Sequence, residues 1–199
     1  SAIKNGGTNG DVTFRGMFGS RIKMLVDGSE NLGACPSRMD APTSYIQPES
    51  FDQITVIKGP QTVQYATPGS AATVIFQRQP ENLSKEQPYR GQASVLMGSY
   101  GRLDHNIEAA IGDESKYARL NANRSIADDY KDGNDKSIHS NWERWNTDLA
   151  LGWKPTDDSW LELRAAKGDG EAAYAGRSMD GSQFKRESLG LHAEQKNIT

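Results

Sequence analysis

The chain has 199 residues but only one cysteine, Cys35, so it cannot form an internal disulfide bond. It lacks any stretch of roughly 18 consecutive apolar residues, which excludes a membrane-spanning helix. It also lacks a run of basic residues and has a formal net charge of −3, so we expect no nucleic-acid partner. A mean hydropathy of −0.73 is still compatible with a membrane protein, because a spanning β-strand needs apolar side chains only at alternate positions.

Recognisable catalytic residues are missing as well. The sequence shows no Ser-His-Asp set and no isolated pair of carboxylates, and its three histidines are scattered along the chain. A lone histidine is a weak signal for a ligand or a catalytic group. We therefore expect a protein that is not an enzyme. The chain begins at Ser1 without an initiator methionine, which leads us to expect a piece of a longer, processed protein.

Residues 1–82 predict a compact domain with short strands and many turns. One apolar run, Arg21–Gly28, ends at Asp-Gly, which is a strong turn signal. A second run, Phe51–Gly59, alternates its apolar side chains between two faces and is followed by a proline. We expect a short helical piece at Gln61–Tyr65 and a further strand at Ala72–Gln77. The domain is therefore predicted to be of the α+β class.

Residues 90–199 follow a different pattern, in which apolar and polar side chains alternate with period two. One face carries Leu, Ile and Trp, while the other carries charged residues, which a sandwich core would not bury. Short connections alternate with long loops at Ser125–Trp145 and Lys167–Glu187, as is typical of an antiparallel outer-membrane barrel. Six strands cannot close a large barrel, so we expect its first strands here. The alternative is a soluble meander with long loops. We expect the lipid-facing residues to be Leu149, Leu151, Trp153, Leu161, Leu163, Leu189 and Leu191, and the lumen-facing residues to be Asp148, Glu162, Arg164 and Glu194.

The single cysteine lies four residues before a methionine, in the segment Gly33-Ala-Cys-Pro-Ser-Arg-Met-Asp40. Pro36 suits the first position of a helical turn, which would make Cys35 the cap and place the Cβ atom of Met39 roughly 5–6 Å away. A thiolate and a thioether form a soft ligand pair, which favours Cu(I) over Mg, Ca, Mn and Zn. We expect their sulfur atoms to lie within roughly 4 Å of each other if they share an ion. The alternative is a buried cysteine beside a methionine that fills a gap in the core.

Two motifs in the first domain resemble the plug of the TonB-dependent outer-membrane receptors. The segment Phe14-Arg-Gly-Met-Phe-Gly-Ser-Arg-Ile-Lys-Met-Leu-Val-Asp-Gly28 is similar to the Arg-Gly…Asp-Gly segment of that family. The segment Ile54-Thr-Val-Ile-Lys-Gly-Pro-Gln-Thr-Val-Gln-Tyr65, with Pro68-Gly-Ser-Ala-Ala-Thr-Val74 after it, is similar to the family's Val-Ile-Arg-Gly-Pro…Tyr-Gly…Gly-Gly-x-Ile motif. The usual glycine-rich ending is replaced here, although the small residues still permit close backbone packing. The two motifs occur in the family's order.

Within that family, the sequence is similar to the copper receptor subfamily. Residues Gly33–Ile46 resemble its plug loop, in which the cysteine and the methionine ligate copper, and Lys167–Leu191 resemble part of its barrel. The resemblance implies that Cys35 and Met39 are copper ligands. It also implies a further His-x-Met pair from the barrel, which we expect beyond residue 199.

The same resemblance implies an architecture and a function. Residues 1–82 would be a plug domain whose N-terminal part is missing, and residues 90–199 would be the first strands of a barrel of about 22 strands in the outer membrane of a Gram-negative bacterium. Copper, as Cu(I), would be the transported ligand. The inner-membrane TonB complex would be the partner, acting through a Ton box that precedes Ser1. Two alternatives stay open: a receptor for a siderophore or another metal chelate, and a barrel for surface adhesion or phage binding.

Overall fold

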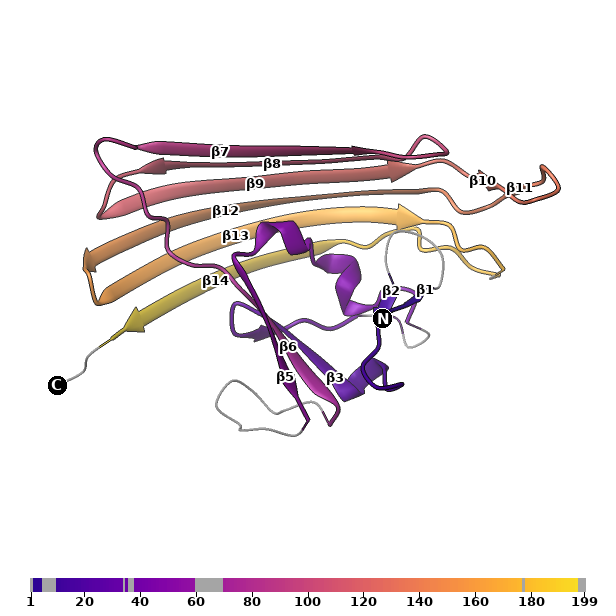
Figure 1. Ribbon diagram of the computed structural model, residues 1–199, viewed down its shortest axis with the longest axis horizontal. Coiled ribbons are helices and arrows are strands. Elements are labelled where there is room, and N and C mark those ends of the chain that lie inside the picture. The colour runs from indigo at the N-terminus through magenta and orange to yellow at the C-terminus, as the bar shows by residue number, and fades with distance from the viewer. Residues whose placement is uncertain are drawn as a thin grey trace. The chain divides into compact units, whose positions relative to one another are not determined.

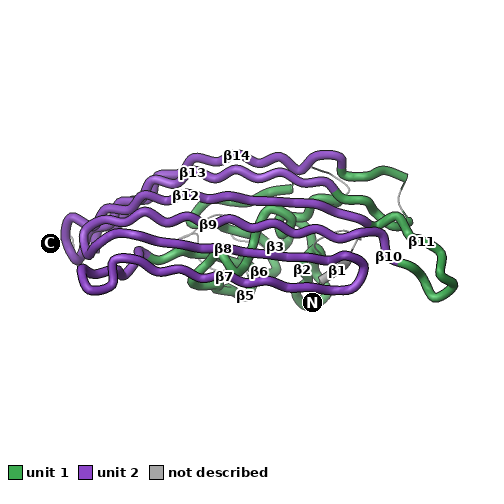
Figure 2. The backbone as a smooth tube through the Cα atoms, turned by 90° about the horizontal axis from the view of Figure 1, so that it is seen from above, with its two compact units in different colours: residues 1–79, 131–140, 172–181 green, residues 80–130, 141–171, 182–199 purple. Residues whose placement is uncertain are grey.

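The structure is a computed structural model that describes residues 2–4 (backbone only), 10–33, 35, 38–59, 70–176 and 178–196. The chain forms two compact units, coloured separately in Figure 2. The first unit comprises residues 1–79, 131–140 and 172–181, and the second comprises residues 80–130, 141–171 and 182–199. The segment expected to be helical, Gln61–Tyr65, lies outside the described residues.

The first unit contains a four-stranded sheet in the order β4-β3-β6-β5 (Figure 1). Its strands are β3 (Ile22–Val26), β4 (Ser29–Glu30), β5 (Gln53–Lys58) and β6 (Ala72–Gln77). Strands β3 and β6 are parallel, and the other neighbours are antiparallel. The β3–β4 turn is made by Asp27 and Gly28, whose φ angles of 48° and 85° are the positive values that a type I′ hairpin turn requires. The strands expected from the sequence of this unit are confirmed.

Short elements complete the first unit. Strand β1 (Ala2–Lys4) pairs antiparallel with β2 (Gly10–Val12), and 3-10 turns lie at η1 (Gly19–Arg21), η2 (Pro42–Tyr45) and η3 (Pro48–Ser50). No helix in the part of the chain that the structure describes has the length and apolar character needed to cross a membrane. The core of the unit consists of Ile22, Met24, Ile46, Ala71, Val74 and Phe76. Burial of these side chains fixes the sheet against the segment that carries the cysteine-methionine motif.

The second unit is a six-stranded sheet in the order β14-β13-β12-β9-β8-β7. Its strands are β7 (Tyr89–Met97), β8 (Leu103–Gly112), β9 (Lys116–Ala127), β12 (Trp142–Thr156), β13 (Ser159–Ala172) and β14 (Arg186–Gln195). The pairs β7–β8, β8–β9, β9–β12 and β13–β14 are antiparallel. A small ribbon of β10 (Tyr130–Lys131) and β11 (Ser137–Ile138) lies in the connection from β9 to β12.

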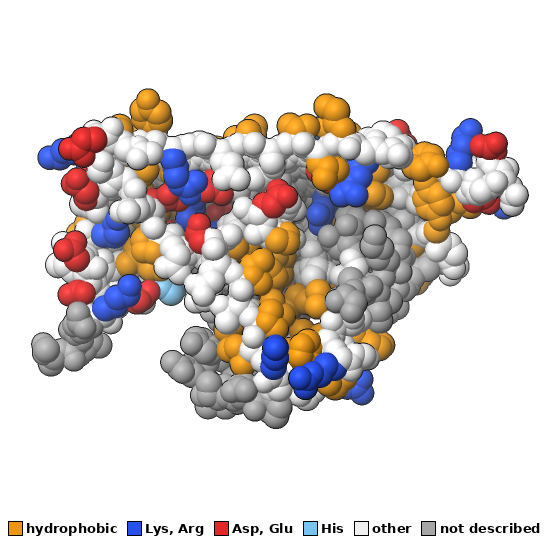
Figure 3. Space-filling view, viewed as in Figure 1, with side chains coloured by type: hydrophobic (Ala, Val, Ile, Leu, Met, Phe, Trp, Pro, Cys, Tyr) orange, Lys and Arg blue, Asp and Glu red, His pale blue; other side chains and the backbone are white. Residues whose placement is uncertain are grey.

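In this sheet the buried face is mainly polar and the exposed face is apolar, which is the reverse of the pattern in a water-soluble protein. Along β9 the buried side chains are mainly polar, whereas Leu120 on the other face is 45% exposed. On β13, Glu162 is 1% exposed and its neighbour Leu163 is 46% exposed. Figure 3 shows apolar side chains projecting along its upper edge. The exposed apolar residues include Ile107, Ile111, Leu149, Leu151, Trp153, Leu189 and Leu191. An apolar band that faces outward is the arrangement of strands that face lipid.

The two long loops are shorter than the sequence suggested, so their predicted limits were wrong. Strand β9 continues to Ala127 and β12 begins at Trp142. Ser125, which was expected in the loop, pairs with Arg144 of β12. Strand β13 continues to Ala172. The end of β13, Lys167–Ala172, consists of charged residues, glycines and one alanine, so it gives no alternation of large apolar side chains, although the strand extends through it.

Candidate metal centre

The cysteine-methionine segment forms a tight turn in the first unit. The N–H of Arg38 donates a hydrogen bond to the carbonyl oxygen of Cys35, three positions earlier, at 2.9 Å. Arg38 has a φ angle of 57°, and this left-handed backbone redirects the chain just before Met39. Cys35 is not part of a disulfide bond, and both sulfur-bearing side chains are half-buried. The helical turn predicted from Pro36 stays a prediction, because it depends on residues that the structure does not describe. The positions of Pro36 and Ser37 lie outside the described residues.

The buried side chain of Asp40 holds this turn by hydrogen bonds. It is 2% exposed, and its Oδ1 accepts the N–H of Cys35 at 2.8 Å while its Oδ2 accepts the hydroxyl of Tyr45 at 2.7 Å. Gly33 makes the close approach feasible, because a Cβ atom at that position would lie 2.1 Å from the carbonyl oxygen of Asp40. Only glycine can stand there without moving the backbone that carries Met39 and Asp40.

An ion pair holds the exit of the turn. Asp11 is 3% exposed and receives Nε and Nη2 of Arg38, the latter at 2.8 Å, so the guanidinium binds the carboxylate with two hydrogen bonds. The hydrogen bond to Asp11 raises the pKa of Arg38 above its ordinary value. Arg38 is therefore a fixed cation beside the turn, which joins the turn to β2.

A residue far along the chain also contacts the turn. The hydroxyl of Tyr174 donates a hydrogen bond of 2.5 Å to the carbonyl oxygen of Met39, across 135 positions of sequence. Tyr174 is 4% exposed and follows the end of β13. Sequence reasoning proposed Cys35 and Met39 as ligands but did not single out Asp40 or Tyr174, whose hydrogen bonds hold the turn. Asp40 directly follows Met39, and this position could have suggested a role in the turn. Nothing in the sequence linked Tyr174 to Met39.

The donor set of the turn is soft. It offers one thiol and one thioether, and such ligands select Cu(I) over cations that prefer oxygen. Among the described residues, no group of three or more His, Cys, Asp or Glu side chains is arranged to hold a metal ion. A carboxylate-rich site for a hard cation is therefore not present in that part of the chain, and the turn is its candidate metal centre.

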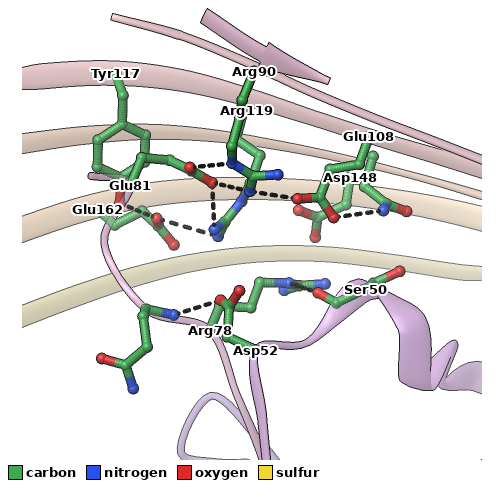
Figure 4. A network of polar contacts seen from close by, with 12 residues as sticks. Ser50, Asp52, Arg78, Glu81, Arg90, Glu108, Tyr117, Arg119, Asp148 and Glu162 are labelled. Atoms are coloured by element: carbon green, nitrogen blue, oxygen red, sulfur yellow. Dashed lines mark hydrogen bonds and ion pairs between the residues drawn. The ribbon is translucent and has the colours of Figure 1, made fainter. Parts of the chain in front are cut away.

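A second polar cluster lies on the buried face of the six-stranded sheet (Figure 4). Glu81, in the segment that precedes β7, accepts two hydrogen bonds of 2.6 Å from Arg90 and one of 3.1 Å from Arg119. Arg90 also reaches Glu108 at 2.5 Å. Lys154 donates from its Nζ to the backbone oxygen of Glu81 at 2.7 Å. These contacts fix the start of the second unit to three strands of its own sheet.

The cluster continues toward β13. Arg119 lies 3.5 Å from Glu162, which also accepts the hydroxyl hydrogen of Tyr117 at 2.5 Å. The indole N–H of Trp160 donates to the hydroxyl oxygen of Tyr117 at 2.9 Å, and Arg164 pairs with Glu162 from the same strand. Each buried carboxylate thus has cationic partners, as an ion buried in a protein requires. The network therefore links the segment before β7 to strands β7, β8, β9, β12 and β13.

Comparison with known proteins places these features in context. The profile described as the TonB-dependent receptor plug domain matches residues 2–73. A solved structure of the copper transporter OprC is 54% identical to the chain with a TM-score of 0.93, and the match covers 100% of this chain and 31% of that one. The comparison with curated protein sequences gives no match. The chain thus spans 31% of the length of the copper transporter.

Two further solved structures share the fold at low identity. The FrpB iron transporter from Neisseria meningitidis is 14% identical with a TM-score of 0.72, covering 97% of this chain and 34% of that one. A mutant of the ferric enterobactin receptor PfeA from Pseudomonas aeruginosa is 16% identical with a TM-score of 0.66, covering 94% of this chain and 32% of that one. At these identities the likeness concerns the fold alone.

Proposed function

We propose that this chain, which belongs to the TonB-dependent receptors, serves the import of copper across the outer membrane of a Gram-negative bacterium. The observation that carries the proposal is the 54% identity to a copper transporter over the full length of the chain. The iron and ferric-siderophore receptors that share the fold are only 14–17% identical. Copper is therefore favoured over a siderophore or another metal chelate as the cargo. We assign no enzymatic activity to the chain.

Cys35 and Met39 are the proposed copper ligands. Cys35 would bind as a thiolate and Met39 through its thioether, and both sulfurs are soft donors suited to Cu(I). The turn that carries them is held at three points, namely Asp40 on the N–H of Cys35, Asp11 on Arg38, and Tyr174 on the carbonyl of Met39. A pre-formed backbone lowers the entropy lost when the ion binds. Additional ligands, by resemblance a His-x-Met pair, would complete the coordination.

The architecture we propose for the protein assigns residues 1–82 to a plug and residues 90–199 to the first strands of a barrel of about 22 strands. The plug profile ends at residue 73 and the first long strand begins at Tyr89, which supports a boundary between them. The TonB complex of the inner membrane is the proposed partner. It would act through a Ton box and would open a path for copper by pulling on the plug.

The proposal is tested by the metal content of the intact protein, purified from outer membranes of cells grown with copper. We expect copper equimolar with the wild-type protein, and loss of that copper in Cys35→Ala and in Met39→Leu. Leucine has nearly the volume of methionine, so the second variant removes the sulfur and little else. Met97→Leu is the matched control, because Met97 is 79% exposed at the end of β7 in the other unit. Copper content unchanged in Cys35→Ala would overturn the proposal.

A further inference from the structure

The carbonyl of Met39 is held by a residue from a different part of the chain. Tyr174 lies in a loop after β13, described at residues 172–176 and 178–181, which we call the Tyr174 loop. These residues belong to the same compact unit as the cysteine-methionine turn. The hydroxyl of Tyr174 donates to the carbonyl oxygen of Met39 at 2.5 Å, and the ring is 4% exposed. A buried hydroxyl in such a bond has little freedom to move.

The Tyr174 loop is itself braced. Ala172 and Gly181 exchange two backbone hydrogen bonds of 2.8 and 2.9 Å, which close the base of the loop. Asp180 accepts the N–H of Tyr174 at 3.2 Å through Oδ1, and its Oδ2 lies 2.7 Å from Nε2 of His139. The backbone of Tyr174 is therefore held by its own loop, which Asp180 joins to the segment that carries His139.

We propose that Tyr174 is a positioning residue for the copper ligand Met39, an inference that rests on the proposed function. The two ligands have separate supports, since Asp40 holds the backbone of Cys35 and Tyr174 holds that of Met39. Methionine has a flexible side chain with three rotatable bonds, so fixing its backbone leaves only the side-chain torsions to be ordered when the sulfur binds an ion. Groups that orient a metal ligand without touching the metal commonly change metal affinity by about 10-fold or more.

Such a link is reciprocal. If the Tyr174 loop favours the copper-binding form of the turn, copper binding must favour the ordered form of the loop by the same factor. Copper is therefore expected to protect backbone amides of residues 172–181 from hydrogen exchange. The protection should be lost when the hydroxyl of Tyr174 is removed, even though the loop keeps the Ala172–Gly181 bonds and the Asp180 contact to the Tyr174 N–H.

The test compares Tyr174→Phe with wild type in the intact protein. The substitution removes one hydroxyl and keeps the ring, so the fold is retained. Loss of this hydrogen bond should weaken Cu(I) binding about tenfold, measured by competition with a chromophoric Cu(I) chelator. Copper X-ray absorption should show fewer sulfur neighbours in the variant. Hydrogen exchange of residues 172–181 should no longer respond to copper.

A matched control separates positioning from general stability. Tyr117 is also 4% exposed and also donates its hydroxyl at 2.5 Å, but to Glu162 in the other unit. Tyr117→Phe should leave Cu(I) affinity and sulfur coordination as in wild type. If Tyr174→Phe matches wild type in affinity, in sulfur coordination and in copper-dependent exchange, while Cys35→Ala loses copper, the positioning role is wrong and the proposed function stands. If wild type and Cys35→Ala bind copper equally, the proposed function itself fails.

Discussion

Replacement of Glu81 by glutamine removes the charge on which Arg90 and Arg119 converge at the start of the second unit. Glu81 is 5% exposed, and its two oxygens accept three hydrogen bonds from these arginines at 2.6, 2.6 and 3.1 Å. Glutamine has the same shape but carries no charge and only one acceptor oxygen. The substitution therefore tests how much the buried ionic cluster contributes to the stability of the sheet.

Arg90 and Arg119 differ in the carboxylate partners that they retain when Glu81 is replaced by glutamine. Arg90 keeps a second carboxylate, Glu108, at 2.5 Å, and its side chain is 32% exposed. Arg119 is 4% exposed and keeps a longer contact of 3.5 Å with Glu162. Removing one partner of a buried ion pair costs about 3–5 kcal/mol, and because Glu108 and Glu162 remain we expect Glu81→Gln to lower the free energy of unfolding by about 2–3 kcal/mol.

The pH dependence has a definite sign. Burial alone would raise the pKa of Glu81, but the hydrogen bonds and charges of Arg90 and Arg119 outweigh it, so the pKa lies below its ordinary value. A carboxylate with a depressed folded-state pKa contributes stability above its unfolded pKa of about 4.3 and loses it as the pH falls through the folded value. The difference in free energy of unfolding between wild type and Glu81→Gln should be constant near neutral pH. It should shrink as the pH falls below the unfolded pKa of Glu81 and through its folded pKa.

The free energies of unfolding of wild type and Glu81→Gln can be compared by equilibrium unfolding with guanidinium in detergent micelles, followed by tryptophan fluorescence. Trp160 belongs to the same cluster and reports on it. The control is Glu143→Gln, because Glu143 pairs with Arg124 at 2.6 Å while the two side chains are 46% and 48% exposed. An exposed pair of this kind should change stability by less than about 1 kcal/mol. Equal unfolding midpoints for the two variants would refute the reasoning about the buried cluster.

Two further outcomes follow from the structure. Spin labels at Leu151 and Leu163 should be relaxed by oxygen dissolved in lipid, and a label at Asp148 by a polar reagent; the reverse pattern would mean that the two faces of the sheet are inverted. Gly33→Ala places a methyl group where the carbonyl of Asp40 lies, so it should destabilise the turn by about 1–3 kcal/mol and weaken Cu(I) binding, as chelator competition measures. Wild-type copper affinity in that variant would show that the turn tolerates displacement.

Much of the fold could be predicted because it follows from local patterns. The Asp27-Gly28 turn, the strand Ala72–Gln77 and the exposure of Leu151 and Leu163 all follow from residues within a few positions of one another. The limit of the loop after β13 was missed because Lys167–Ala172 contains no large apolar side chain, and only the backbone shows that it continues the strand.

The candidate site also has a part that could be proposed from the sequence and a part that could not. Cys35 and Met39 were recognisable because both sulfur atoms fall within one short segment. The support from Tyr174 could not be predicted, because it joins positions 135 residues apart through a single hydroxyl. The convergence of Arg90 and Arg119 on Glu81 was equally hidden, since it depends on which strands of the sheet become neighbours.

The site assignment is tested most directly by anomalous diffraction at the copper edge from crystals of the wild-type protein loaded with Cu(I). We expect one strong anomalous peak between Sγ of Cys35 and Sδ of Met39, at about the 2.3 Å from each that metal–sulfur bonds show. The peak should be absent in crystals of Met39→Leu prepared in the same way. A copper peak at any other position, with no density between these two sulfurs, would contradict the assignment of Cys35 and Met39 as the copper ligands.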